Sequence, residues 1–254
     1  MTILQQILAL KAKEVAALPA NFPPRIAPLV PFYPTQKQTL AIIAEIKRAS
    51  PSKGVINEAV DPVKQAKLYE QAGAMAISVL TDELYFKGSM ADMAAVKAAV
   101  AVSVLNKDFI ISTKQIDHAY AYGADMILLI VAALTDDALQ KLYQYARTQQ
   151  LDVLVETHNA EEFARALTLG ARIIGINHRN LHDFTMDLTI SASLLTDFNK
   201  CGRLIIAESG IGNRTDAERL ATAGVDGLLV GETLMRSTDP ATCIQQLQVT
   251  RYAY

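Results

Sequence analysis

Cysteine is scarce in this chain, and net charge is small. The two cysteines, Cys201 and Cys243, cannot build a disulfide framework, and no CxxC pair or histidine cluster indicates a bound metal. Lysine and arginine nearly balance aspartate and glutamate, which leaves a formal net charge of −2 at pH 7. This balance gives no support for nucleic acid or an anionic membrane as a partner, so any anion-binding site has to be local.

Long apolar runs are also missing. No run reaches the length of about 20 residues that a membrane-spanning helix needs. The first residues, MTILQQILALKAKEVAAL, place Lys11 and Lys13 behind the apolar residues and offer no cleavage site, so we do not expect a secretory signal. The cytoplasm is therefore the expected location. We expect a monomer, with a weak homo-oligomer as the alternative.

Short apolar runs, in contrast, recur along the whole chain. Eight of them cover residues 40–47, 74–80, 102–109, 125–131, 151–156, 171–177, 203–209 and 226–231. They read as continuous Val, Ile, Leu and Ala, as expected for parallel strands that are buried on both faces. Amphipathic segments with helical spacing alternate with them, at 62–72, 90–100, 113–122, 136–149, 160–169, 187–198, 214–223 and 240–248.

Eight such strand–helix units favour an α/β fold, a closed (β/α)8 TIM barrel, over a doubly wound sheet. Four glycines lie where a helix should end before the next strand, and we expect a positive φ there: Gly73, Gly123, Gly170 and Gly224. No break in composition marks a second domain. We therefore expect one domain over 1–254, with an N-terminal extension at 1–38 and the barrel at 39–254.

The extension has two possible interpretations. Residues 2–18 favour an amphipathic helix, and the proline-rich stretch at 19–34 cannot continue it. One interpretation is a segment that packs against or caps one end of the barrel. The other is a lid over the mouth of the pocket.

Polar and charged residues follow the apolar runs, at the point where each strand should end. Because the carboxyl ends of parallel barrel strands meet on one face, these residues should line a single pocket: Lys47, Lys107, Glu156, Asn177 and Glu208. Taken singly, each is at least as well explained as a structural polar residue. Together they indicate a site, because buried charge is otherwise disfavoured.

The stretch EIKRASPSKG at 45–54 is the most distinctive in the chain. Glu45 and Lys47 are two residues apart, so in a strand they share a face and would point into the barrel mouth. A structural ion pair is the alternative to a catalytic role. The loop that carries Ser50 and Lys53 suits an anionic group, although a solvated loop would look similar.

Lys107, with a glutamate from a neighbouring strand, makes a general acid and base pair. Desolvation and nearby cations would lower the lysine pKa and a carboxylate would raise it, and the sequence leaves open which effect wins. Phe109 is either a core residue or an aromatic wall. Asn159 is expected to cap the helix after Glu156. The histidines show no metal-ligand spacing, and surface or structural roles are expected for His118, His158, His178 and His182.

Glycine-bearing loops follow the seventh and eighth runs, as ESGIGN (208–213) and LVGETLMRS (229–237). Such loops expose backbone N–H groups, and a short helix that begins near Glu232 would add its N-terminal dipole. We expect a phosphate site there. The candidates are Ser209, Gly210, Gly231 and the backbone of Glu232.

With these motifs in place, the chain resembles the indole-3-glycerol phosphate synthases of tryptophan biosynthesis. The matching segments are EIKRASPSKG, YFKGS (85–89), KDFI (107–110), LVETHN, GIN-RNL (175–181), AESGI and VGETLM. The resemblance implies a lyase that closes the indole ring of 1-(2-carboxyphenylamino)-1-deoxyribulose 5-phosphate with loss of CO2 and water. Ring closure makes the carbon that bears the carboxylate tetrahedral and electron-poor, so no pyridoxal or thiamine cofactor and no metal is expected.

The resemblance also implies roles for individual residues. Lys107 would protonate the substrate carbonyl, Glu156 would be the base of the dehydration, and Lys47 would lie near the substrate carboxylate and share the acid role. Glu45, Asn177 and Glu208 would orient these groups and stabilise developing charge. The phosphate would be held by Ser50, Lys53, Ser209, Gly210, Gly231 and Glu232. Phe86 and Phe109 would flank the aromatic ring, and Arg179 would support the site.

Three features depart from the family pattern: Asn106 replaces a frequent Arg, His178 replaces a usual Asn, and the helix at 113–121 differs. Strand alternation should turn Asn106 and His178 away from the mouth. Two alternatives stay open. Phosphoribosylanthranilate isomerase, in the same superfamily, would want a Cys or Asp pair at strand ends, which the positions of Cys201 and Cys243 do not favour. A non-catalytic phosphate-binding barrel would lack Lys107 or Glu156.

Overall fold

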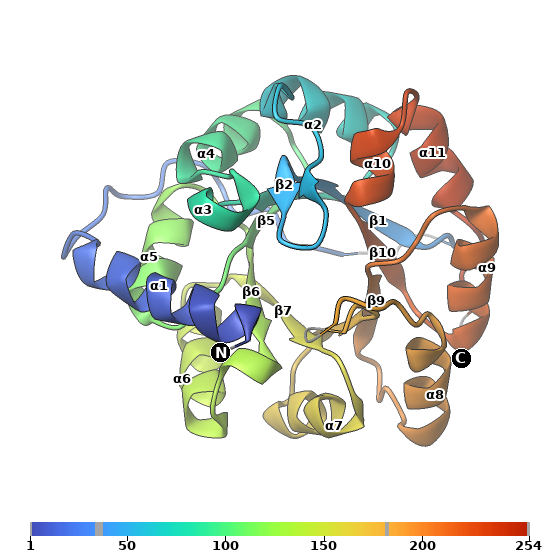
Figure 1. The fold of residues 1–254 in the computed structure, drawn as a ribbon. Coiled ribbons are helices and arrows are strands. Elements are labelled where there is room, and N and C mark those ends of the chain that lie inside the picture. The colour runs from blue at the N-terminus through green and yellow to red at the C-terminus, as the bar shows by residue number, and fades with distance from the viewer. Residues whose placement is uncertain (1, 34–37, 181–182, 253–254) are drawn as a thin grey trace.

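Eight parallel strands close into a barrel, and helices surround it (Figure 1). The computed structural model describes residues 2–33, 38–180 and 183–252, so Pro34, Leu181 and His182 lie outside the described residues. The barrel strands are β1 (Ala41–Ile46), β4 (Ala76–Leu80), β5 (Ser103–Lys107), β6 (Met126–Ile130), β7 (Asp152–Thr157), β8 (Ile173–Asn177), β9 (Leu204–Glu208) and β10 (Gly227–Val230). The first strand pairs in parallel with both β4 and β10, which closes the ring.

Each predicted run coincides with one of these strands, although β7 extends one residue beyond its run, to Thr157. Each predicted amphipathic segment contains a helix, so the barrel prediction is confirmed. The surrounding helices are α2 (Pro62–Gln71), α4 (Met90–Ala99), α5 (Thr113–Ala121), α6 (Asp136–Thr148), α7 (Ala160–Leu169), α8 (Thr189–Asp197), α9 (Arg214–Ala223) and α11 (Pro240–Leu247). Shorter elements lie between them: the β2 (Ala49–Ser50) and β3 (Gly54–Val55) hairpin, α3 (Glu83–Phe86), η2 (Val131–Ala133) and α10 (Glu232–Arg236). The four glycines predicted at helix ends all have a positive φ, between 76° and 99°.

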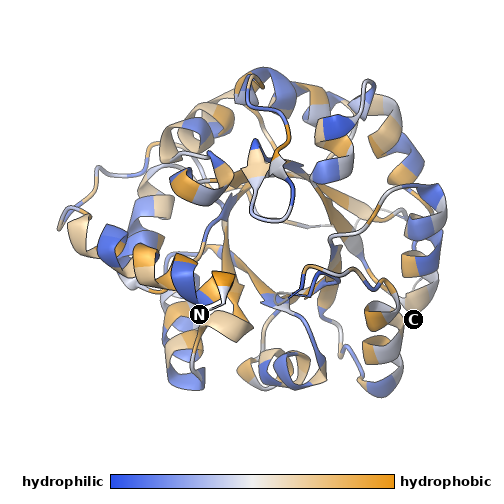
Figure 2. Ribbon diagram, in the orientation of Figure 1, coloured by the Kyte–Doolittle hydropathy of each residue, from blue (hydrophilic) through white to orange (hydrophobic). Residues whose placement is uncertain are grey.

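Two buried layers hold the barrel together. Alternate strand residues such as Ile43, Leu105 and Leu154 fill its interior, and the intervening ones pack against the helices. Figure 2 shows hydrophilic and hydrophobic residues alternating along those helices. Each Ile or Leu side chain that is fully buried contributes about 1.5–3 kcal/mol, so the continuous apolar strands supply much of the stability. Among the described residues, no helix has the length and apolar character needed to cross a membrane.

The N-terminal extension contacts both ends of the barrel. Its helix α1 (Ile3–Ala17) starts at Thr2, whose side chain forms a capping box with Gln5. Ile3, Leu4 and Ile7 of α1 line the cavity at the barrel mouth.

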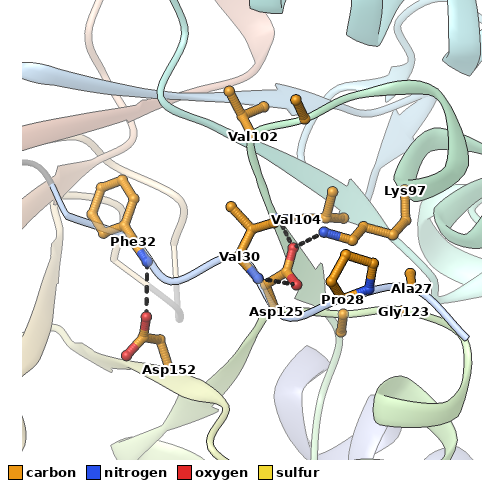
Figure 3. A network of polar contacts seen from close by, with 12 residues as sticks. Ala27, Pro28, Val30, Phe32, Lys97, Val102, Val104, Gly123, Asp125 and Asp152 are labelled. Carbon is orange, nitrogen blue, oxygen red and sulfur yellow. Dashed lines mark hydrogen bonds and ion pairs between the residues drawn. The ribbon is translucent and has the colours of Figure 1, made fainter. Parts of the chain in front are cut away.

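The stretch after α1 passes to the opposite end, where Phe32 enters the barrel interior and donates its N–H to Asp152 Oδ2 at 2.9 Å (Figure 3). The extension therefore occupies both positions that the sequence left open, over the mouth and against the floor.

Candidate active site

A cavity of about 450 Å³ opens at the carboxyl ends of the barrel strands. The strand-end residues predicted to converge line it together: Lys47, Lys107, Glu156, Asn177 and Glu208. The other residues assigned to the site line it too: Glu45, Ser50, Lys53, Phe86, Phe109, Arg179, Ser209, Gly210, Gly231 and Glu232. Barrel closure therefore brings every candidate site residue to one cavity, as expected.

Lys107 occupies the centre of the charged wall. It ends β5, and its Nζ donates to Glu156 Oε2 of β7 at 3.1 Å and lies 3.6 Å from Glu208 Oε2 of β9. These three strands alternate around the barrel, so their side chains fall in one layer. Burial alone would lower the pKa of Lys107, but the carboxylates of Glu156, Glu208 and Glu45 outweigh burial and raise it. The question left open by the sequence is answered in favour of an ammonium group.

The two carboxylates beside Lys107 have opposite tendencies. Burial, followed by the negative charge of Glu156, raises the pKa of Glu208 to about 8. Burial acts in the same direction on Glu156, but the charges of Lys107 and His158 outweigh it and lower its pKa. Glu156 therefore loses its proton more readily than Glu208, and a difference of this direction suits separate roles for the two side chains.

Glu45 and Lys47 form the ion pair that the sequence left open, with Nζ 2.5 Å from Oε1. They do so on the cavity wall, where both side chains are mostly buried. The pair is thus structural in its contacts, and its position also places it beside Lys107.

Glycines make room for two of the carboxylates. A Cβ atom at Gly231 would overlap Glu45 Oε1, and a Cβ atom at Gly175 would overlap Glu208 Oε1. The close approach of a side chain, and not a positive φ, is therefore what requires glycine at both positions. Sequence reasoning assigned Gly231 to phosphate binding alone and missed Gly175. The signal for Gly175 was a glycine in the middle of an otherwise branched apolar strand.

The loops after β9 and β10 were expected to hold a phosphate. In the first of them, Ser209 and Gly210 both have a positive φ, of 66° and 75°. The short helix α10 begins at Glu232, as predicted. The Glu232 side chain instead faces cations, with Oε1 3.4 Å from Lys53 Nζ and Oε2 3.8 Å from Arg179 Nη2.

The remaining predicted residues complete the wall. Phe86 and Phe109 lie with ring centroids 6.0 Å apart on the cavity lining, so Phe109 is a wall residue. Arg179 donates to Ser52 Oγ at 2.9 Å, which joins the loop after β1 to the loop after β8. Asn177 Oδ1 accepts the N–H of Arg179 at 3.0 Å.

Asn106 and His178 turn away from the cavity, as strand alternation predicted. Asn106 Nδ2 donates to Thr81 Oγ1 at 2.9 Å. The buried ring of His178 lies between Ser191 Oγ, 2.8 Å from Nε2, and the Ser209 carbonyl oxygen, 3.2 Å from Nδ1. Burial lowers the pKa of His178.

Two charged residues at the site were not anticipated. Lys11 of α1 is buried with its Nζ 2.9 Å from both Asp82 Oδ2 and Asp108 Oδ1, which fastens the extension next to Lys107. His158, expected to have a surface or structural role, is buried with Nε2 3.2 Å from Glu156 Oε1. Its spacing of two residues from Glu156 was the available signal. His118, in contrast, stacks on Phe22 at 4.7 Å.

The described parts of the chain contain neither a metal-binding cluster nor a cysteine at the cavity. There, no group of three or more His, Cys, Asp or Glu side chains is arranged to hold a metal ion. Cys201 is exposed and Cys243 is half-buried, and neither lines the cavity. The cavity is therefore lined by ammonium, carboxyl and amide groups, next to the glycine-bearing loops after β9 and β10.

Comparisons with known proteins agree with this geometry. A family sequence model described as indole-3-glycerol phosphate synthase matches residues 4–247. A protein of that name from Exiguobacterium sibiricum is 54% identical and aligns over 84% of this chain and 82% of its own length. One from Listeria monocytogenes is 46% identical over 99% of this chain and 100% of its own.

Solved structures resemble the chain in fold. A 3-hexulose-6-phosphate synthase superposes with a TM-score of 0.64 at 18% identity, over 82% of this chain and 98% of its own. A thiamine phosphate pyrophosphorylase from Pyrococcus furiosus gives 0.60 at 17% identity, over 84% and 95%. At such identities the likeness concerns the barrel alone.

Proposed function

The chain belongs to the indole-3-glycerol phosphate synthase family, and we propose that its own strand-end residues carry out the reaction of that family. The reaction converts 1-(2-carboxyphenylamino)-1-deoxyribulose 5-phosphate to indole-3-glycerol phosphate, CO2 and water, a step of tryptophan biosynthesis. The observation that carries the proposal is the contact of Lys107 with Glu156 and Glu208 in a cavity that Ser209, Gly210 and Gly231 also line.

Ring closure comes first. The Lys107 ammonium group donates a proton to the substrate carbonyl oxygen while the aryl carbon that bears the carboxylate attacks the carbonyl carbon. Lys47, held by Glu45 at 2.5 Å, faces the substrate carboxylate and is the second ammonium group that can share the acid role. Charge fixed in place before the reaction is typically the largest catalytic contribution, because it needs no reorganisation when charge develops.

Loss of CO2 follows from the same geometry. Ring closure leaves the attacking aryl carbon, which still bears the carboxylate, tetrahedral and the nitrogen cationic, so the electrons of the breaking C–CO2 bond return to the ring. Glu45, Asn177 and Glu208 orient the ammonium groups and stabilise the positive charge on this intermediate. The chain's own residues therefore suffice for this step.

Dehydration restores the aromatic indole. The ionised Glu156 accepts a proton from the ring carbon, and an ammonium group protonates the departing hydroxyl group, which leaves as water. The lowered pKa of Glu156 keeps it in the base form at neutral pH. Its contact with Lys107 places the base and the acid on the same side of the cavity.

Binding of the phosphate positions the substrate for these steps. The phosphate lies far from the bonds that change, and the loops at Ser209, Gly210 and Gly231, with Ser50 and Lys53, hold it. Remote binding of this kind raises the rate by fixing the reacting groups in place. Phe86 and Phe109 flank the aromatic ring, and Arg179 supports the loops around it. A cytoplasmic location is proposed from the biosynthetic role.

The test is a fluorescence assay of the purified chain with the carboxyphenylamino-deoxyribulose phosphate. We expect a fluorescent indole product without added metal or cofactor, and an equal rate after treatment with a chelator. Parallel incubation with phosphoribosylanthranilate tests the isomerase alternative. Phosphate binding with no turnover of either compound would instead favour a non-catalytic barrel.

A further inference from the structure

A second cavity, of about 560 Å³, lies beside the first, between α1 and the segments that follow β7 and β8. The two cavities share Leu4, Asn177 and Arg179 in their walls. Glu156 lines the first cavity and His158 the second. The contact between these two side chains therefore joins the base of the active site to a neighbouring space.

His158 is held from both sides by carboxylates. Nε2 lies 3.2 Å from Glu156 Oε1, within ion-pair distance. Nδ1 lies 3.0 Å from Glu162 Oε2, and the same oxygen accepts the backbone N–H of His158 at 2.9 Å. Glu162 is itself fixed, because its Oε1 accepts from Asn159 Nδ2 at 2.8 Å. The imidazole therefore lies between two carboxylates, with Nδ1 anchored on Glu162 and Nε2 next to Glu156.

The surroundings of His158 favour the charged form of its ring. Burial alone would lower the pKa of His158, but Glu156 and Glu162 outweigh it and raise the pKa to about 9. Lys107 of β5 lies beyond Glu156, and the segment after β8 contributes Arg179, His178 and Asp187 to the same cavity. Among the described residues, α1 and its cap residue line this cavity with uncharged side chains: Thr2, Leu4, Gln5 and Leu8.

We propose that His158 is a positioning residue for Glu156, and that its imidazolium group, anchored on Glu162, holds the Glu156 carboxylate ionised and directed at Lys107. The proposal rests on the proposed function, because it takes Glu156 as the base of the dehydration. In this arrangement Lys107 Nζ contacts Glu156 Oε2, and His158 Nε2 contacts Glu156 Oε1. Each oxygen has its own cation, so the carboxylate cannot rotate without losing one of them.

The experiment compares His158→Gln with the parent chain. The variant keeps a polar side chain of similar reach but loses the positive charge next to Glu156. We expect kcat to fall by about tenfold or more near pH 6, with KM changed by less than about threefold, because acid–base positioning acts on the chemical steps. We expect the acid limb of the kcat–pH profile to move upward by about one unit, since a lost cation raises a carboxylate pKa.

Two further variants complete the comparison. Glu162→Gln keeps the imidazole and loosens its anchor, so the same acid limb should move in the same direction by a smaller amount. His118→Gln removes a histidine that stacks on Phe22 and lines neither cavity, so its profile should match the parent. An acid limb of His158→Gln that coincides with that of the parent would overturn the proposal.

Nuclear magnetic resonance of the imidazole gives a second measurement, and its result in the parent chain does not depend on any variant being folded. In the parent chain the ring of His158 should remain protonated at pH 7.5, and in Glu156→Gln its titration should move down by one unit or more. A ring that titrates near pH 6.5 in the parent contradicts the proposal. If the parent itself does not turn over the substrate, the proposed function fails instead, so the two failures are distinguishable.

Discussion

Both ends of the barrel bury charged side chains, but the hydrogen bonding of Asp125 at the floor differs from that of Glu208 at the mouth. At the floor, Asp125 Oδ1 accepts from the Val30 N–H, and Oδ2 accepts from Lys97 Nζ and the Val104 N–H (Figure 3). Asp125 Oδ1 also accepts from Arg25 Nη2. At the mouth, Glu208 Oε1 is buried without a hydrogen-bond partner. A buried polar group is normally satisfied, because leaving it unpaired costs about 1–3 kcal/mol.

This difference separates a structural use of buried charge from a chemical one. The floor network ties the extension to β5 and β6, and every oxygen of Asp125 has two donors. At the mouth, the carboxylates outnumber the ammonium groups that lie close enough to pair with them. This imbalance shifts pKa values and leaves oxygen acceptors for a substrate. Perturbing each end should therefore affect different measurable quantities.

The largest effect should come from Lys107→Ala at the mouth. Removing the ammonium group between Glu156 and Glu208 should lower kcat by about 10²–10⁴-fold, the range of general acid–base catalysis. Substrate binding should persist, because the loops proposed to hold the phosphate are unchanged. The assay is indole fluorescence together with a binding titration; a variant that turns over like the parent would remove Lys107 from its role.

Next in size is Asp125→Ala at the floor. It leaves Lys97 and Arg25 without their carboxylate, and breaking a buried ion pair costs about 3–5 kcal/mol. We expect a lower melting temperature in a thermal unfolding experiment, with kcat within about twofold of the parent while the chain is folded. A loss of kcat in the folded variant would show that the two ends are coupled.

A matched pair of glycine variants sharpens the comparison further. Gly175→Ala should push the Glu208 carboxylate aside and lower kcat by about tenfold. Gly227→Ala, at the start of β10, meets the Ala41 backbone and Ile206 instead, so it should lower stability and spare kcat. Steady-state kinetics and thermal melts of both variants test this difference. Equal losses of kcat in the two variants would contradict the prediction.

The smallest effect should appear in the pH dependence of stability. His158 has an ordinary pKa of 6.5 and a folded-state pKa raised to about 9, so the folded chain binds the extra proton between these values. Its stabilising contribution is full below pH 6.5 and is lost as pH rises through 9. We expect the parent to lose roughly 1–2 kcal/mol more than His158→Gln between pH 6 and 9.5 in urea unfolding.

Much of the fold and most of the site followed from local sequence patterns. Val155 and Ile176 lie in runs whose apolar character predicts strands, and Gly170 and Gly224 mark helix ends. The run-end positions of Lys107 and Glu156 predicted a shared cavity. Gly175 and His158 were missed because their importance depends on Glu208 and Glu156 being close to them, and side-chain proximity across strands has no local signature.

The sequence by itself determined the order of strands and helices, the barrel class and the residues delivered to its mouth, because periodicity and glycine placement act over short distances. Only the tertiary structure decided which charges meet. Closing the ring brings the side chains of Lys107 on β5, Glu156 on β7 and Glu208 on β9 together in one layer, and this contact moves the pKa values of the two glutamates in opposite directions. The extension's contacts with both barrel ends, through Lys11 and Phe32, likewise depend on how the chain is folded back.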